Sequence, residues 1–153
     1  MQGLLEELSA PEGEGWGHRD AEILLCLPGV GPVVSATMLS EAAPPLGDRD
    51  DPAWRMDAGV APVTRQSGKR KVVVMRRACH PRLREAVYHR ARTSVQKEER
   101  GKRQYAHLRA QGQSHGRALR GVADRNLAML MSMLKSGTLY DAARRGGVLA
   151  EAA

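Results

Sequence analysis

Ser67 lies close to four cations, Arg65, Lys69, Arg70 and Lys71, in a short stretch of the chain. A serine hydroxyl is a poor nucleophile toward a phosphodiester unless nearby positive groups stabilise the charge that builds up on the phosphate. Arginine and lysine side chains at this spacing can supply that stabilisation. The stretch therefore predicts Ser67 as a catalytic nucleophile in nucleic-acid strand cleavage, with the four cations as phosphate contacts.

A second interpretation of the same stretch is structural. Ser67 precedes Gly68, and a serine beside a glycine is typical of a turn in which the hydroxyl bonds to its own backbone. Composition alone favours the turn residue. On this reading the basic residues bind nucleic acid and no nucleophile is needed.

A glycine-containing turn at residues 27–32, Leu-Pro-Gly-Val-Gly-Pro, is the second candidate contact with nucleic acid. Glycines let a backbone approach a phosphate closely, and unpaired amides at the start of a helix point toward an anion. We expect Gly29, Val30 and Gly31 to contact the sugar-phosphate backbone from a helix-hairpin-helix. The same glycines also suit a purely structural turn between two helices.

The positive charge is concentrated in one part of the chain. The whole sequence has 24 Lys and Arg against 17 Asp and Glu, and residues 64–125 alone hold 18 basic and 4 acidic side chains. Such a segment can neutralise phosphates and release counterions, which makes binding to DNA or RNA salt dependent. Within it we expect Arg76, Arg77 and Arg84 to add nucleic-acid contacts. The alternative is a solvated helix face.

The remaining composition excludes several classes of site. Cys26 and Cys79 provide neither a disulfide framework nor zinc-ligand spacing, and the acids do not cluster like metal ligands. We therefore predict no metal site in this chain. No apolar run is long enough to span a bilayer, and the first residues are acidic where a signal peptide is positive. We expect a cytoplasmic protein with no membrane partner.

The order of apolar positions and breakers predicts a mostly α fold with at most one short strand or hairpin. Residues 1–17 are expected to be a flexible tail or linker, residues 18–140 one helical domain, and residues 141–153 a disordered tail. The domain begins with two helices around the glycine turn, the second opening at Pro32. A break follows at 44–48, where two prolines and a glycine occur.

The spacing of apolar residues also predicts the elements in the middle and at the end of the domain. A short capped helix is expected at 51–58, a loop around Ser67, and a strand at 71–75. Beyond Pro81 an amphipathic helix places Leu83 and Val87 on its apolar side and Arg90 on a basic side. The longest apolar stripe predicts a core helix from His115 to about Leu134.

These motifs, taken in order, resemble the C-terminal transposase domain of the IS110/IS116/IS902 insertion-sequence family. The similarity spans roughly residues 20–140. The segments that carry it are 27–32, 59–62, 66–69 and 83–88, followed by Tyr105, Leu108, Gly112, Ala118, Val122, Ala123, residues 133–135 and Tyr140. The chain departs from the family pattern at Cys79-His80 and at 124–126.

The resemblance implies a DNA transposase that cleaves and rejoins strands through a serine nucleophile, for which Ser67 occupies the matching position. It implies that four metal-binding acids lie in a separate RuvC-like half, so Mg²⁺ is expected only there, and that a structured guide RNA selects the DNA. Arg65, Lys69 and Arg70 are assigned here by charge rather than by motif. The partners that the resemblance implies are then DNA, a guide RNA, and either further copies of this chain or the RuvC-like half.

Because that half is missing from the sequence, we expect a truncated or separately expressed piece that is inactive alone. Two other classes of function stay open. One is a non-catalytic helix-hairpin-helix module that binds DNA or RNA, and the other is a basic structural protein that becomes ordered only when it assembles with RNA.

Overall fold

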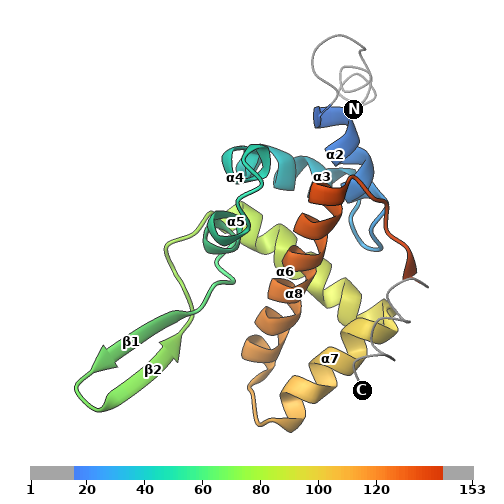
Figure 1. Ribbon diagram of the computed structural model, residues 1–153. Coiled ribbons are helices and arrows are strands. Elements are labelled where there is room, and N and C mark those ends of the chain that lie inside the picture. Colours follow the sequence, from blue (N-terminus) through green and yellow to red (C-terminus); the bar gives the residue numbers. More distant parts are fainter. Residues whose placement is uncertain (1–15, 143–153) are drawn as a thin grey trace.

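The computed structural model describes residues 16–142, and within them the fold is mostly helical with one β-hairpin, as the sequence predicts (Figure 1). The elements in chain order are α2 (Trp16–Leu25), α3 (Pro32–Glu41), α4 (Ala43–Gly47), α5 (Asp51–Asp57), β1 (Val63–Ser67), β2 (Arg70–Val74), α6 (Pro81–Lys97), α7 (Glu99–Ala110) and α8 (His115–Ser136).

The core is built on α8, which runs through the middle of the molecule in Figure 1. Ser114 caps its first turn by accepting a hydrogen bond from the Arg117 amide, and Gly137 ends it in a left-handed conformation with a φ of 63°. Its apolar stripe packs against α6, which contributes fully buried Leu83 and Val87. The predicted core helix and the predicted amphipathic helix are both confirmed.

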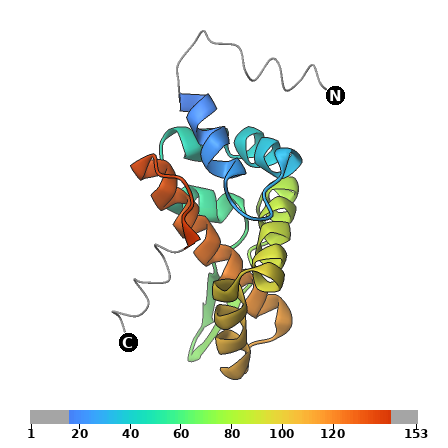
Figure 2. The ribbon, with the colours of Figure 1, turned by 90° about the vertical axis from the view of Figure 1, so that its right-hand side faces the viewer.

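The turn between α2 and α3 is tied to the body of the molecule. Gly29 has a φ of +80°, and a Cβ added there would lie 2.3 Å from Cγ2 of Thr93 on α6. Only glycine fits that close approach. Pro32 occupies the first turn of α3 and Gly31 is its N-cap residue, as expected from the sequence. Figure 2 shows this turn beside α6.

The two strands form an antiparallel hairpin that projects from the helices, on the side opposite α2 (Figure 1). The register pairs Val63 with Val74 and Ser67 with Arg70, so Gly68 and Lys69 form a two-residue turn. Gly68 has a φ of 58° while Lys69 does not have a positive φ, which is the pattern of a type II′ turn. That turn matches the natural twist of paired strands.

Four local expectations differ from the structure. The Ser67 segment is not a loop, because residues 63–67 form β1. The break at 44–48 is instead mostly the short helix α4, which two prolines can begin because its first amides need no partner. The first helix starts at Trp16, inside the expected tail. Arg90 lies in the interior with 3% exposure rather than on a solvent-facing side of α6.

The expected tail at 141–153 lies almost entirely outside the described residues, as do the first 15 residues of the expected N-terminal tail. Among the described helices, none combines the length and the apolar character that crossing a membrane requires.

Candidate nucleic-acid interface

Ser67 is the last residue of β1, and its side chain is exposed. It lies directly across from Arg70 in the hairpin register. Side chains of paired residues in an antiparallel ladder point to the same face, and alternate residues of a strand share that face. Arg65 and Arg70 are therefore on the face that carries Ser67. The hydroxyl and two guanidinium groups are presented together to solvent.

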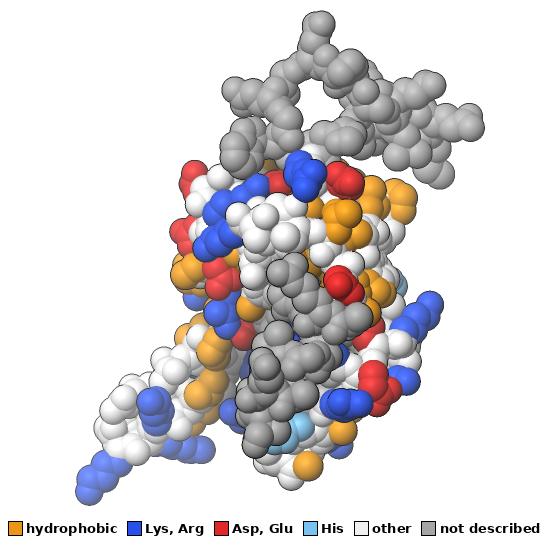
Figure 3. Space-filling view, turned by 45° about the vertical axis from the view of Figure 1, so that its right-hand side comes forward, with side chains coloured by type: hydrophobic (Ala, Val, Ile, Leu, Met, Phe, Trp, Pro, Cys, Tyr) orange, Lys and Arg blue, Asp and Glu red, His pale blue; other side chains and the backbone are white. Residues whose placement is uncertain are grey.

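The other two cations assigned to Ser67 occupy different positions. Lys71 pairs with Gln66, so both lie on the opposite face of the hairpin. Lys69 is at the tip, in the turn itself. All of these side chains are exposed, and Figure 3 shows Lys and Arg gathered along the outer part of the hairpin with no acidic side chain among them. The structure thus places Arg65 and Arg70 on the Ser67 face, Lys69 at the tip and Lys71 on the opposite face.

A groove of about 680 Å³ lies at the base of the hairpin, where the two strands meet the segment leading to α6. Val63 and Val74 form part of its apolar lining, and Arg65, Arg76 and Arg77 supply three positive charges. Arg76 is oriented by its own Nε, which donates a hydrogen bond of 3.1 Å to the Ala78 carbonyl. No carboxylate lines the groove, so it favours an anion.

The groove continues the face that carries Ser67, because Val63, Arg65 and Ser67 alternate along β1. Sequence reasoning named its three arginines and predicted a strand at 71–75, but it missed β1, the strand that carries Arg65. The signal was present: a two-residue turn containing Gly68, flanked on both sides by five residues able to pair.

Arg84 does not join this cluster. Its Nη1 lies 3.7 Å from the Sγ of Cys79, and its Cδ lies against Gly59, so the side chain is held along the start of α6. It acts electrostatically on Tyr88: burial raises the pKa of the Tyr88 hydroxyl above its usual value, and the charges of Arg120 and Arg84 partly offset that rise. Arg84 is therefore a half-buried cation between the groove and the core.

The three predicted contact residues of the glycine turn differ in how accessible they are. Val30 is 5% exposed, and its amide already donates to the Leu27 carbonyl at 3.1 Å. Gly29 is exposed, although Thr93 fills the space that a Cβ at this position would need. Gly31 is also exposed, and it caps α3 without any side-chain hydrogen bond, so the start of α3 is open. In Figure 1 this turn and the hairpin lie on different sides of the helices.

No group of three or more His, Cys, Asp or Glu side chains that could hold a metal ion occurs in residues 16–142. Asp124, one of the few acids of the basic segment, has a structural role. Its Oδ1 and Oδ2 accept hydrogen bonds of 2.6 and 2.5 Å from Nε and Nη2 of Arg55, which link α5 to α8. That hydrogen bond raises the pKa of Arg55 further above its already high value.

Comparison of the sequence with known proteins identifies relatives of this chain. The family described as transposases of the IS116/IS110/IS902 group matches residues 21–106, a region that contains the glycine turn, the hairpin and α6. The chain belongs to this transposase family. The expected similarity across residues 20–140 is thus supported by a family match that covers the first part of that range.

Curated proteins that are similar to this chain extend the match. A mini-circle protein of Streptomyces coelicolor, assigned as the transposase for IS117, is 33% identical over 141 residues, which cover 89% of this chain and 33% of that protein. A 44.8 kDa protein of insertion element IS116 from Streptomyces clavuligerus is 32% identical over 78% of this chain and 30% of its own length. A 42 kDa protein of IS900 from Mycobacterium paratuberculosis is 33% identical over 80% of this chain.

The chain spans about a third of the length of these curated relatives. It is thus comparable to one portion of a longer insertion-sequence transposase.

Proposed function

We propose that this transposase-family chain binds the sugar-phosphate backbone of DNA with its hairpin and that Ser67 is the nucleophile for strand cleavage and rejoining. The observation that carries the proposal is the placement of an exposed hydroxyl beside Arg65 and Arg70 on one face, with Arg76 and Arg77 continuing that face at the hairpin base. A phosphate seated there meets several cations and no competing carboxylate.

In the proposed step, Oγ of Ser67 forms a bond to phosphorus and the bond from phosphorus to one sugar oxygen breaks. The departing sugar oxygen takes up a proton, and the serine proton is lost to solvent, because the described hairpin strands contain neither His nor a carboxylate. Arg65 and Arg70 stabilise the added negative charge on the phosphate oxygens. The strand is then held as a phosphoserine, and attack by another sugar hydroxyl reverses the bond changes and rejoins DNA.

The turn between α2 and α3 provides a second backbone contact in this proposal. The exposed start of α3 presents amides that no side chain caps, and Gly31 allows close approach because nothing lies within 4 Å of where its Cβ would be. This is the helix-hairpin-helix role expected from the sequence. Because the turn and the hairpin lie on different sides, they would hold separate stretches of nucleic acid.

The resemblance adds partners that belong to the same proposal. The described residues do not fit a Mg²⁺ site, since they contain no acidic cluster, so the metal-binding acids would lie in a RuvC-like part of the longer transposase or in another subunit. We infer that the chain needs that part to cleave DNA and is inactive alone. A structured guide RNA and self-association are the other proposed partners.

A non-catalytic DNA-binding module is the second candidate function. It is favoured by the position of Ser67 beside the turn residue Gly68, where a serine is common for structural reasons alone. The exposed cations would bind nucleic acid equally well in that case.

A covalent-capture experiment separates the two candidates. The chain is combined with a RuvC-like half and supercoiled donor DNA of a related insertion element, and DNA-linked protein is measured by denaturing gel and peptide mass spectrometry. The proposal predicts a phosphoserine at Ser67 that is absent in Ser67→Ala, while Ser67→Ala still binds DNA. Thr64→Ala, which removes a hydroxyl from the opposite hairpin face, is the matched control and keeps the adduct. An adduct that persists in Ser67→Ala excludes Ser67 as the nucleophile.

A further inference from the structure

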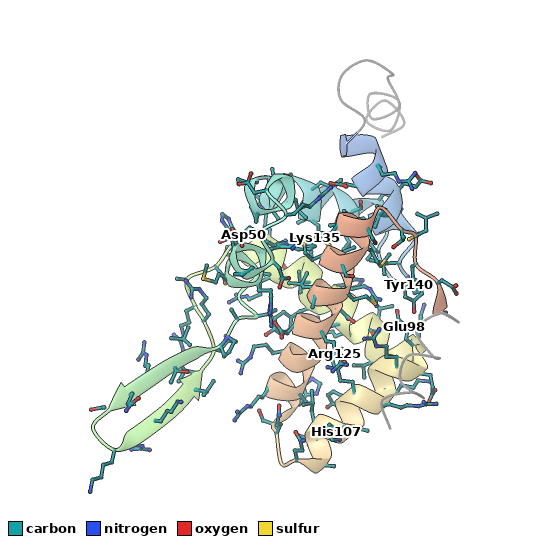
Figure 4. All side chains as sticks on the ribbon, viewed as in Figure 1. Asp50, Glu98, His107, Arg125, Lys135 and Tyr140 are labelled. Carbon is teal, nitrogen blue, oxygen red and sulfur yellow. The ribbon has the colours of Figure 1, made fainter. Side chains whose placement is uncertain are left out.

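A second basic cavity lies away from the hairpin, on the other side of α8. It has a volume of about 670 Å³ and is enclosed by the end of α6, the first turns of α7, α8 and the segment after α8. Figure 4 shows Glu98, His107, Arg125 and Tyr140 on this side, well separated from β1 and β2. Neither the transposase family match nor the role proposed for Ser67 accounts for it.

The cations of this cavity converge from three helices. Lys97 ends α6, Arg100 and Arg103 belong to α7, and Arg125 comes from α8. A stripe of charge along one helix is usually a solvated face, whereas charges brought together by separate elements define a concave positive site. The α8 contribution matters most here, because Arg125 is far from the other three in sequence.

The two acids of the lining do not cancel this charge. Oε1 of Glu98 is 2.7 Å from Nη1 of Arg90, a guanidinium that is almost completely buried, and Oε2 accepts a hydrogen bond of 2.9 Å from Ser94. The negative charge of Glu98 is thus balanced by Arg90, which is buried and does not line the cavity. Glu99 is well exposed and lies 3.7 Å from Arg103 and 3.9 Å from Lys102, so the lining keeps an excess of positive charge.

Two further features suit a phosphorylated ligand with a flat ring. The first turn of α7 lines the cavity, and Glu98 at its N-cap makes no side-chain hydrogen bond to the helix amides, so the positive end of the helix dipole adds to the field. Tyr140 and Pro28 supply apolar surface beside the cations. An aromatic ring next to a phosphate-binding cluster is how proteins hold single nucleotides of an unpaired strand.

We propose that this cavity binds one nucleotide unit, with its phosphate at Arg103 and Arg125 and its base against Tyr140. The unit comes either from a single-stranded nucleic acid or from a free mononucleotide, which share this chemistry. The inference is independent of the role proposed for Ser67, because the two sites use different residues on different sides of the molecule.

The test measures fluorescence anisotropy of a labelled oligothymidylate of roughly eight nucleotides with the full chain. The Arg103→Ala/Arg125→Ala variant is expected to bind about tenfold more weakly. The matched control is Arg109→Ala/Arg117→Ala, which removes the same charge from exposed positions of the same two helices outside the cavity. It is expected to change affinity less than about twofold. Equal losses in the two variants, or no loss in either, overturn the proposal.

Two further arms identify the ligand. An abasic oligomer of equal length is expected to bind the unaltered chain several-fold more weakly, and equal binding overturns the base contact. Adenosine monophosphate is then added as competitor. If adenosine monophosphate displaces the oligomer, the site is assigned to a free nucleotide. If the oligomer stays bound, and its binding still depends on Arg103 and Arg125, the site is assigned to a nucleic-acid strand. Both outcomes agree with the proposal.

Circular dichroism checks that the double variant folds. If it loses helix, Arg125→Ala alone is tested in its place, with a smaller loss of affinity expected. No loss of affinity in that variant would overturn the proposal. The result is separable from the proposed hairpin function. Duplex binding through Arg65 and Arg70 is measured with other variants, so either site can fail while the other stands.

Discussion

Ser67 and Arg70 are directly opposed in the register of the β1–β2 hairpin, and Arg65 lies two residues before Ser67 on the same face. The pairing is set by a type II′ turn of only two residues, which leaves little freedom for the strands to slip. The placement of Ser67, Arg65 and Arg70 on one face is therefore built into the backbone.

The arginines at the hairpin base should control how DNA binding depends on salt. Replacing Arg76 and Arg77 with Ala removes two cations from the groove, so the slope of log affinity against log salt should decrease by about 2. A titration of a labelled duplex between about 50 and about 200 mM salt measures this. Lys102→Ala/Arg117→Ala removes equal charge elsewhere, and an equal change of slope there would show that the groove has no special role.

Gly29 should be irreplaceable for stability. Alanine at this position must adopt a φ of +80° and push Cγ2 of Thr93 away from a Cβ only 2.3 Å distant, so Gly29→Ala should lower the free energy of unfolding by about 1–3 kcal/mol. Urea denaturation measures the loss. Gly31→Ala is the control, because that residue has a φ of −87° and open space around it. Equal stability of the two variants would contradict the close packing of the turn on α6.

The link between Arg55 and Asp124 should contribute measurably to the docking of α5 on α8. The two groups make a bidentate pair and are each about 30% exposed, so a double-mutant cycle with Arg55→Ala and Asp124→Ala should give a coupling energy of about 1 kcal/mol. Thermal or urea unfolding supplies the four values. A coupling near zero would mean that the pair is not held in the folded chain.

Tyr88 should make the protein sensitive to alkali. Burial raises the pKa of its hydroxyl above 10.0. Below pH 10 the group is neutral in both the folded and unfolded chain, so pH has no effect through it. As the pH rises further, the unfolded chain loses the proton first and the free energy of unfolding falls until the folded chain ionises too.

Tyr88→Phe is the test of that dependence. The Tyr88 hydroxyl has no hydrogen-bond partner among the described residues, so the variant should be about as stable as the original chain at pH 7, or slightly more stable. Its alkaline loss of stability should also be smaller. A variant that is clearly less stable at pH 7 would reveal a hydrogen bond that the arrangement does not contain.

Periodicity was sufficient to predict the helices that form the core. Val87 on α6 and the apolar stripe of α8 recur at helical spacing, and glycine and proline mark the turn before α3. These signals are local, which is why the sequence carries them clearly.

The parts that sequence could not provide depend on contacts between distant segments. Residues 64–67 are polar and have no apolar alternation, so β1 is recognised only through its pairing with β2 across the turn at Gly68. The sequence predicts Arg90 as a surface residue, because its ion pair with Glu98 in the interior forms only in the folded chain. The assignment of Lys71 to the Ser67 cluster likewise failed to anticipate that pairing would send it to the other face.

The most direct test of the hairpin as a phosphate-binding surface compares two double variants of equal charge. Arg65→Ala/Arg70→Ala removes the cations on the Ser67 face, and Lys69→Ala/Lys71→Ala removes those at the tip and on the opposite face. Affinity for a labelled DNA duplex at fixed salt should fall at least about tenfold in the first variant and clearly less in the second. Equal losses, or a larger loss in the lysine variant, would contradict the assignment of that face to the scissile phosphate.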